Sequence, residues 1–299
     1  LVARGVVTNR LWFKLVARLT GADRSIQAGV YEFPAGASAT QVLRTLEEGR
    51  AVALRFTVPE GLTVAEIAAL AEERLGVPAD SVVVAARDPA LIEALGVPGA
   101  GPARSLEGFL LPETYLLPVD IGGRELVRIM AEHFVRGWDP AWDARLDTLG
   151  LSRLELTALA SIVEGEARHD DERAIIAGVY HNRLRRRMPL QADPTVQYAI
   201  QLKTGRRKSR LFEKDYLIDS PYNTYLHPGL PPGPVCAPGR KSLVAALYPA
   251  DVPYLFFVAR PDGRHVFTRT YDEHLRAVAA VRRMPRDPGG KGSAPAGGH

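Results

Sequence analysis

Two glutamates, Glu164 and Glu166, stand two positions apart in the segment SIVEGEARHDDERAIIAGVYHNRL (residues 161–184). If the segment is helical, each residue turns by about 100° and one apolar stripe should face the protein interior. That stripe consists of Leu156, Leu159, Ile162 and Val163. Glu166 continues it, whereas Glu164 falls on roughly the opposite side. We therefore expect Glu166 to point inward and Glu164 to point toward solvent.

An inward-facing carboxyl group can serve as a general acid. Burial disfavours the charged form and raises the pKa of such a group. Glu166 also precedes a predicted helix end at residues 168–171, where the helix dipole disfavours negative charge. An upward shift of about two pKa units, about 2.7 kcal/mol, would keep enough of the acid protonated at neutral pH to donate a proton. A purely structural alternative is a buried ion pair with an arginine of the next helix, Arg173 or Arg183.

A polar, aromatic and proline-rich stretch follows at residues 188–240. Its amides, hydroxyls and tyrosine rings suit a neutral, hydroxyl-rich ligand such as a carbohydrate. An ordinary irregular loop whose polar residues only complete turns is the alternative. The candidate substrate-binding residues are Gln191, Asp193, Thr195, Tyr222, Asn223, Thr224 and Tyr225.

Other chemistries lack the residues they need. The chain has no HExxH and no cysteine cluster, and its GRRKS segment lacks the glycine pattern of a phosphate loop. It has no Gly-x-Ser-x-Gly elbow, and the single cysteine, Cys236, has no evident base beside it. We therefore expect no metal, no cofactor and no nucleophile-based hydrolase.

The chain has 299 residues, 46% of them hydrophobic, and a formal net charge of +4, which is the composition of a folded protein. Basic residues gather at 183–187 and 205–210. They fit either solvated loops or contact with an anionic membrane or polymer, whereas nucleic acid is disfavoured because no aromatic residues alternate with them. No apolar run reaches the ~18 residues of a membrane span. Because the sequence begins with Leu1, we expect that a preceding signal or anchor segment was removed.

The remaining elements can be predicted from periodicity and turn residues. Two short helices around a strand at 28–36 are expected in the first 50 residues. Next come a strand and a helix that opens at Thr63 with the capping-box spacing to Glu66, then a pair of helices. A strand or connector at 106–118 leads to a helix at 122–138. A helical hairpin at 152–187, the loop-rich stretch 188–240 and a β-hairpin at 254–270 complete the chain.

Several ordered motifs closely resemble the YceG-like family, the endolytic murein transglycosylases. They are LASIVEGEA, NRL, MPLQADPTVQYA, YNTY, GLPPGPVCAPG, SLVAALYPA and PYLFFVA. Upstream, AGVYEF, VPEGLTVAEIA and LEGFLLPETYLLP resemble the LysM-like portion of the family and its connector. The resemblance covers roughly residues 5 to 280. This sequence departs from the family at Gly165, where a lysine is common.

The resemblance implies a bacterial enzyme anchored by one N-terminal transmembrane helix, with its catalytic part outside the cytoplasmic (inner) membrane. It implies internal cleavage of nascent peptidoglycan strands between N-acetylmuramic acid and N-acetylglucosamine, leaving 1,6-anhydro ends and terminating strand elongation. Glu166 would be the catalytic acid, Gln191, Thr195 and Asn223 would orient sugars, and Asp193 would structure the loop or hold Asn223. Synthases of the elongation or division machinery are the implied partners.

Three other functions remain open at this point. A hydrolytic muramidase would use Glu164, Asp193 or Asp219 to position water. A non-catalytic peptidoglycan-binding scaffold would use the LysM-like part and keep Glu166 as a structural acid. A basic nucleic-acid binder lacks a recognition motif.

We predict an α+β fold with a small LysM-like domain before a mixed, helix-rich catalytic domain that carries a β-hairpin. The expected divisions are an N-terminal α+β segment at 1–55, a LysM-like subdomain and connector at 56–120, a catalytic domain at 121–284 and a disordered tail at 285–299.

Overall fold

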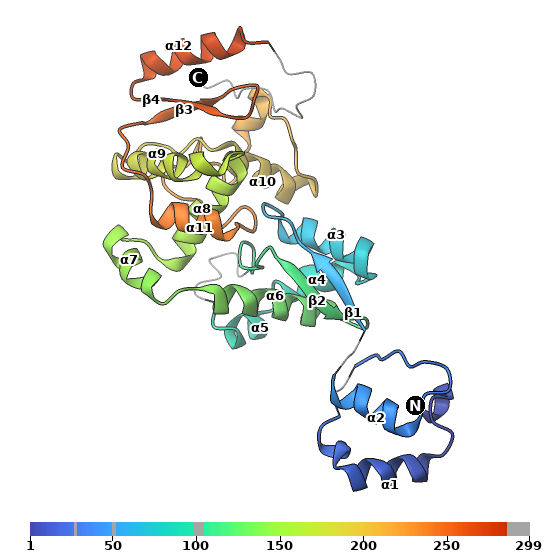
Figure 1. Cartoon of the computed structure of the whole chain (residues 1–299). Coiled ribbons are helices and arrows are strands. Elements are labelled where there is room, and N and C mark those ends of the chain that lie inside the picture. Colours follow the sequence, from blue (N-terminus) through green and yellow to red (C-terminus); the bar gives the residue numbers. More distant parts are fainter. Residues whose placement is uncertain (27–28, 50–51, 98–104, 286–299) are drawn as a thin grey trace.

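A computed structural model describes residues 1–26, 29–49, 52–97 and 105–285 (Figure 1). Helices α1 (Arg10–Thr20) and α2 (Ala39–Glu47) form the N-terminal part, where Val42, Leu43 and Leu46 are buried as predicted. Residues 29–36 form no strand, so the strand predicted over 28–36 is wrong across its described part. Tyr31 and Phe33 pack on the apolar cluster around Val42 as irregular chain instead. Nearly all of the predicted tail lies outside the described residues.

The next unit is a two-stranded antiparallel sheet with three helices between its strands. Strand β1 (Ala53–Thr57) pairs with β2 (Thr114–Pro118), and α3 (Val64–Leu75), α4 (Ala79–Ala85) and α5 (Pro89–Ala94) lie between them in sequence. Helix α3 starts at the predicted capping box, in which Thr63 and Glu66 bond each other's backbone. It ends at Gly76, whose φ of 69° suits glycine. The helices and strands are confirmed here, whereas the LysM-like identity stays a prediction.

The C-terminal half is built mainly of helices that pack on one another. Its elements are α6 (Gly123–Gly137), α7 (Ala141–Leu149), α8 (Arg153–Glu166), α9 (Arg173–Arg185), α10 (Asp193–Thr204), α11 (Arg240–Leu247), β3 (Phe256–Ala259), β4 (His265–Thr268) and α12 (Tyr271–Arg282). Single-turn or slightly longer 3-10 helices occur at Val2–Arg4, Ala22–Arg24, Asp170–Glu172 and Glu213–Leu217. The hairpin of α8 and α9 and the β3–β4 hairpin are as predicted. In Figure 1, the β3–β4 hairpin and α12 form the outermost layer beyond α9.

Helix α10 corrects the prediction of a loop-rich stretch at 188–240. It begins at Asp193, carries Pro194 in its first turn, and buries Val196 and Ala199. A proline is compatible with a helix start because the first N–H groups have no intrahelical partner. Helix α10 is only a few turns long and lies between proline-rich and glycine-rich segments. The helical spacing of its apolar residues is therefore hard to recognise in the sequence.

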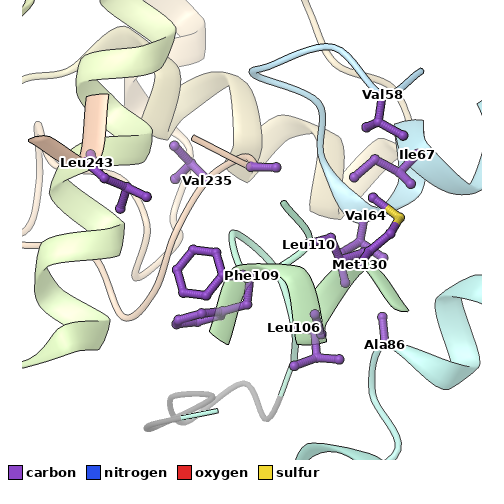
Figure 2. Packing of buried hydrophobic residues seen from close by; sticks show 14 of the residues in the cluster. Val58, Val64, Ile67, Ala86, Leu106, Phe109, Leu110, Met130, Val235 and Leu243 are labelled. Atoms are coloured by element: carbon purple, nitrogen blue, oxygen red, sulfur yellow. The ribbon is translucent and has the colours of Figure 1, made fainter. Parts of the chain in front are cut away.

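One apolar core extends from the β1–α3 unit into the C-terminal helices. Figure 2 shows Phe109 between Leu110 and Met130 on one side and Val235 and Leu243 on the other. A core shared in this way fixes the two halves against each other, because interiors are packed at crystal-like density. Because the core crosses residue 120, the predicted boundary between a LysM-like subdomain and a catalytic domain at that residue stays a prediction. The predicted boundary at residue 55 falls inside strand β1. No helix in the described part of the chain combines the length and the apolar character needed to cross a membrane.

A buried carboxylate, Glu107, also joins the two halves. Its oxygens accept from the backbone N–H of Val64, at 3.0 and 3.2 Å, and from the Tyr198 hydroxyl of α10 at 3.2 Å. Beside them the Gln201 amide of α10 donates to the Thr63 hydroxyl at 2.9 Å. Helix α10 is thereby tied to the N-terminus of α3. Burial raises the pKa of Glu107 from 4.5 to about 7, against the opposing effect of these hydrogen bonds.

We expect Glu107→Gln to alter how stability depends on pH. A raised folded-state pKa contributes stability that is complete below pH 4.5 and lost as the pH rises through about 7. The wild-type free energy of unfolding should therefore fall by about 2 kcal/mol more than that of the variant between pH 5 and pH 8. Urea titrations of both proteins at the two pH values measure this difference. Equal pH dependence in the two proteins would refute the assignment.

Candidate active site

Glu166 is the last residue of α8 and is partly buried, as predicted. The Tyr180 hydroxyl of α9 donates a hydrogen bond of 2.9 Å to its Oε1 atom. Burial, followed by the negative charge of Asp193, raises the pKa of Glu166 to about 8. The Tyr180 hydrogen bond and the positive charge of Arg183 act in the opposite direction. At neutral pH the group is therefore mainly protonated and can donate a proton.

Glu166 faces a small cleft of roughly 100 Å³. The cleft is lined by the end of α8, the start of α10, the end of the basic run with the segment that follows it, and the β3–β4 hairpin. Its lining residues are Gly165, Glu166, Arg168, Asp193, Pro194, Gln197, Ser209, Arg210, Leu211, Tyr216, Ala259, Gly263 and His265. A Cβ atom at Gly165 would lie 2.6 Å from the Pro194 ring, so the missing side chain allows α8 and α10 to approach closely beside the acid.

Asp193 is the second carboxylate of the cleft. It accepts from the Tyr225 hydroxyl at 2.7 Å and, more weakly, from the Tyr216 hydroxyl at 3.5 Å. Burial raises the pKa of Asp193, whereas these two tyrosines lower it. Burial thus raises the pKa of both acids, and for Asp193 the two tyrosine donors oppose this rise because they favour its charged form.

Glu164 lies in a buried ion pair, so its predicted exposure to solvent is wrong. Its carboxylate accepts from Arg173 at 3.0 Å, from the Ser242 hydroxyl at 2.9 Å and from the Gly239 N–H at 3.0 Å. Only 6% of the Glu164 side chain and 9% of the Arg173 side chain are exposed. The prediction assumed that α8 buries one face and exposes the other. In the structure, α9 and α11 pack on the face that was expected to be exposed.

The alternative of a Glu166–arginine ion pair is not what the structure contains. Arg173 binds Glu164 instead. Arg183 is buried and donates to the backbone carbonyls of Leu255 at 2.7 Å and Leu190 at 2.8 Å. Arg183 acts on Glu166 through its charge, while the groups that bond Glu166 directly are the neutral Tyr180 hydroxyl and the backbone N–H of Asp193. Among the residues that the structure describes, no cation therefore forms an ion pair with Glu166.

The β3–β4 hairpin is held at the cleft by another buried acid, Glu172. Glu172, at the start of α9, accepts from the His265 backbone N–H at 3.0 Å and contacts its Nδ1 atom at 2.8 Å. Only 3% of the His265 side chain is exposed. These bonds fix the hairpin residues that line the cleft, including Gly263 and Ala259.

The seven predicted binding residues fall into two groups. Asp193 lines the cleft, and the Tyr225 hydroxyl donates a hydrogen bond to Asp193. Gln191 is exposed and has a backbone φ of 50°. The other four are buried. Asn223 uses its amide on the carbonyls of Tyr216 and Ile218, the Thr195 and Thr224 hydroxyls bond each other at 2.9 Å, and Tyr222 packs edge-on against Tyr198. None of these four lines the cleft, and direct contact with a ligand stays a prediction for all seven.

Several cleft residues were not identified from the sequence. Tyr180, Tyr216, Gln197, Arg210 and His265 come from four separate segments. The basic run at 205–210 was noted in the sequence, but neither interpretation of it, a solvated loop or contact with an anionic membrane or polymer, connected it to Glu166. Arg210 at its end lines the cleft.

Comparison with known proteins agrees with this architecture. The sequence matches the YceG-like family over residues 1–280. A Bacillus subtilis protein named endolytic murein transglycosylase is 33% identical over 91% of this chain and 77% of its own length. A Streptococcus pneumoniae protein of the same name is 31% identical over 92% of this chain. The chain spans 54% of the length of that streptococcal relative.

A solved structure shares the fold. A yceG-like protein from Listeria monocytogenes superposes with a TM-score of 0.68 and 31% identity, over 92% of each chain. The chain therefore belongs to the YceG-like family. The resemblance seen in the motifs is confirmed, and the class of enzyme that it implied, a lytic transglycosylase, is confirmed with it.

Two substitutions should move the pKa of Glu166 in opposite directions. Asp193→Asn removes a nearby negative charge and should lower it, so activity is lost at a lower pH on the alkaline side. Tyr180→Phe removes a donor to the carboxylate and should raise it, so activity persists to higher pH. The pH profile of kcat/KM for strand cleavage measures both shifts. Tyr254→Phe, distant in sequence and stacked on Phe267, is the control. Shifts of the same sign for Asp193→Asn and Tyr180→Phe would contradict the assignment.

Proposed function

We propose that this protein cuts peptidoglycan glycan strands internally, between N-acetylmuramic acid and N-acetylglucosamine, and leaves 1,6-anhydro-muramic ends. The observation that carries the proposal is Glu166, a carboxyl group held largely protonated at the floor of a cleft. Burial and the nearby charge of Asp193 favour its protonated form, and the Tyr180 side chain that donates to it is a neutral hydroxyl. A group in this state suits proton donation to a glycosidic oxygen.

The reaction follows from one acid acting twice. Glu166 donates its proton to the glycosidic oxygen as the bond to the muramic C1 atom breaks. As a carboxylate it then removes the proton from the C6 hydroxyl of the same sugar, and that oxygen bonds to C1. The proton returns to Glu166, no water is consumed, and the attack is intramolecular, which is favoured by proximity.

Asp193 supports the same reaction electrostatically. Positive charge develops at the muramic C1 and ring oxygen in the transition state. The Asp193 carboxylate, held by Tyr225 and Tyr216 at the same cleft, places negative charge near that centre. Preorganised charge of this kind stabilises a transition state without reorganisation. The same charge raises the pKa of Glu166 and so keeps the acid protonated before the reaction.

A hydrolytic muramidase needs a carboxylate that positions water, and the structure disfavours two of its three candidates. Glu164 is engaged by Arg173, Ser242 and Gly239 on another face of α8. Asp219 is not among the residues that line the Glu166 cleft. Cleavage in water labelled with heavy oxygen separates the two reactions. We expect no label at the new ends, whereas incorporation at the muramic C1 would establish hydrolysis and refute the proposal.

The non-catalytic scaffold is less well supported because a structural acid does not need a raised pKa at a cleft floor. We propose catalysis, with termination of strand elongation as its role beside synthases of the elongation or division machinery. We further propose that the complete protein is held by a single N-terminal helix at the bacterial cytoplasmic membrane, with the catalytic part outside. Fractionation of cells that express the full-length protein tests this location, and recovery in the cytosol would contradict it.

A further inference from the structure

The basic run at residues 205–210 ends at the Glu166 cleft. Arg210 and its neighbours Ser209 and Leu211 line this cleft together with Glu166 and Asp193. Arg168 lies on the lining as well. The cleft therefore has two acids beside the reacting position and a basic border. A wholly neutral glycan does not require such a border.

Arg210 differs from the other basic residues of the run in what it contacts. Arg207 donates to the Gly61 carbonyl at 2.8 Å, and Lys208 pairs with Asp215 at 2.5 Å. The Arg210 guanidinium lies over the Phe212 ring, with its carbon 5.3 Å from the ring centre. Within the described ranges, no carboxylate lies at ion-pair distance from Arg210.

The Phe212 ring holds this guanidinium at the cleft without neutralising it. A guanidinium packed over an aromatic face keeps its N–H donors available at the edge, where they match the two oxygens of a carboxylate. The Lys208 amino group lies over the same ring at 4.8 Å, but it is paired with Asp215 and does not line the cleft, so the positive charge of this border comes from Arg210 and Arg168. The border is thus suited to an anionic group attached to a sugar bound at Glu166.

We propose that Arg210 recognises a carboxylate on the C3 substituent of the muramic sugar that is cleaved. This inference rests on the proposed function and adds a residue that selects the substrate. The carboxylate has two sources. In a strand that carries peptides it belongs to the peptide, and in a strand stripped of peptides it is the free carboxylate of the lactyl ether. N-acetylglucosamine carries no such group, so Arg210 also sets which of the two alternating sugars occupies the reacting position.

Three substrates separate these sources: peptide-bearing strands, strands stripped by an amidase, and stripped strands whose lactyl carboxylates are capped as methylamides. On the strand that carries the carboxylate recognised by Arg210, either the peptide or the lactyl one, Arg210→Ala should lower kcat/KM about tenfold, which is the typical effect of losing a charged hydrogen bond. On the capped, uncharged strands, Arg210→Ala and wild type should be equally active. Arg210→Lys should recover part of the loss, and added salt should reduce the wild-type advantage.

Arg206→Ala is the matched control, because Arg206 is an exposed arginine of the same run that does not line the cleft. Loss only on peptide-bearing strands assigns the peptide carboxylate, and loss only on stripped strands assigns the lactyl carboxylate. An equal loss on the capped strands, or no loss on any strand, would overturn the proposal. Because the wild-type protein still forms anhydro ends in either of those cases, such a result leaves the proposed function intact. Absence of anhydro ends with every substrate would instead refute the proposed function.

Discussion

Replacing Glu166 by glutamine is expected to reduce strand cleavage by about a thousandfold, since general acid–base catalysis contributes on this order. The amide keeps the shape of the side chain and can still accept the Tyr180 hydrogen bond. It cannot donate a proton to the glycosidic oxygen or accept one from the C6 hydroxyl. Release of soluble fragments from uncrosslinked strands measures the rate.

The folded state should survive this change. Glu166 is mainly protonated at neutral pH, so the amide replaces a neutral group of the same size. We expect the thermal unfolding midpoint to stay equal to or slightly above that of the wild type. A variant that unfolds normally but retains a tenth or more of the activity would show that another group supplies the proton.

Breaking the Glu164–Arg173 pair is expected to give the largest loss of stability. Arg173→Met leaves the Glu164 carboxylate buried with only the Ser242 hydroxyl and the Gly239 N–H as partners. Removing one member of a buried pair typically costs about 3–5 kcal/mol. Chemical denaturation should show this decrease in the free energy of unfolding.

Two further variants identify the cause of that loss. Combining Arg173→Met with Glu164→Gln removes the unpaired charge and should restore most of the stability. Arg264→Met is the matched control, because its pair with Asp171 at 2.9 Å has side chains 44% and 64% exposed. Such a surface pair should be worth about 1 kcal/mol or less. A loss of the same small size for Arg173→Met would contradict the buried ion pair.

The sequence allowed the acid to be located because Glu166 continues the apolar stripe of one helix. Helical periodicity gave the wrong prediction for Glu164 because it assumes that a helix buries a single face. Helix α8 buries every residue from Leu156 to Val163, and α9 and α11 both pack against it. For a helix surrounded by others, periodicity cannot tell a solvent-facing position from a buried one.

The polar residues of the 188–240 stretch illustrate a second limit. Their composition predicted a binding region, and two of these residues, Asp193 and Tyr225, meet at the Glu166 cleft, while ligand binding itself stays a prediction. Asn223 and Thr224 are buried, however, and irregular backbone that is buried must find its hydrogen bonds within the protein. Which polar groups are used in this way depends on tertiary contacts. Tyr180 was missed for the same reason, because its contact with Glu166 joins two helices across a sequence separation of 14 residues.

Mass spectrometry of the ends that the protein leaves on uncrosslinked glycan strands, with Glu166→Gln treated in parallel, tests most directly whether Glu166 catalyses a transglycosylation. We expect fragments that end in 1,6-anhydro-muramic acid, lighter by one water than the hydrolysis products, and their loss in the variant. Fragments with reducing muramic ends, or anhydro ends that persist in the correctly folded variant, would contradict this mechanism.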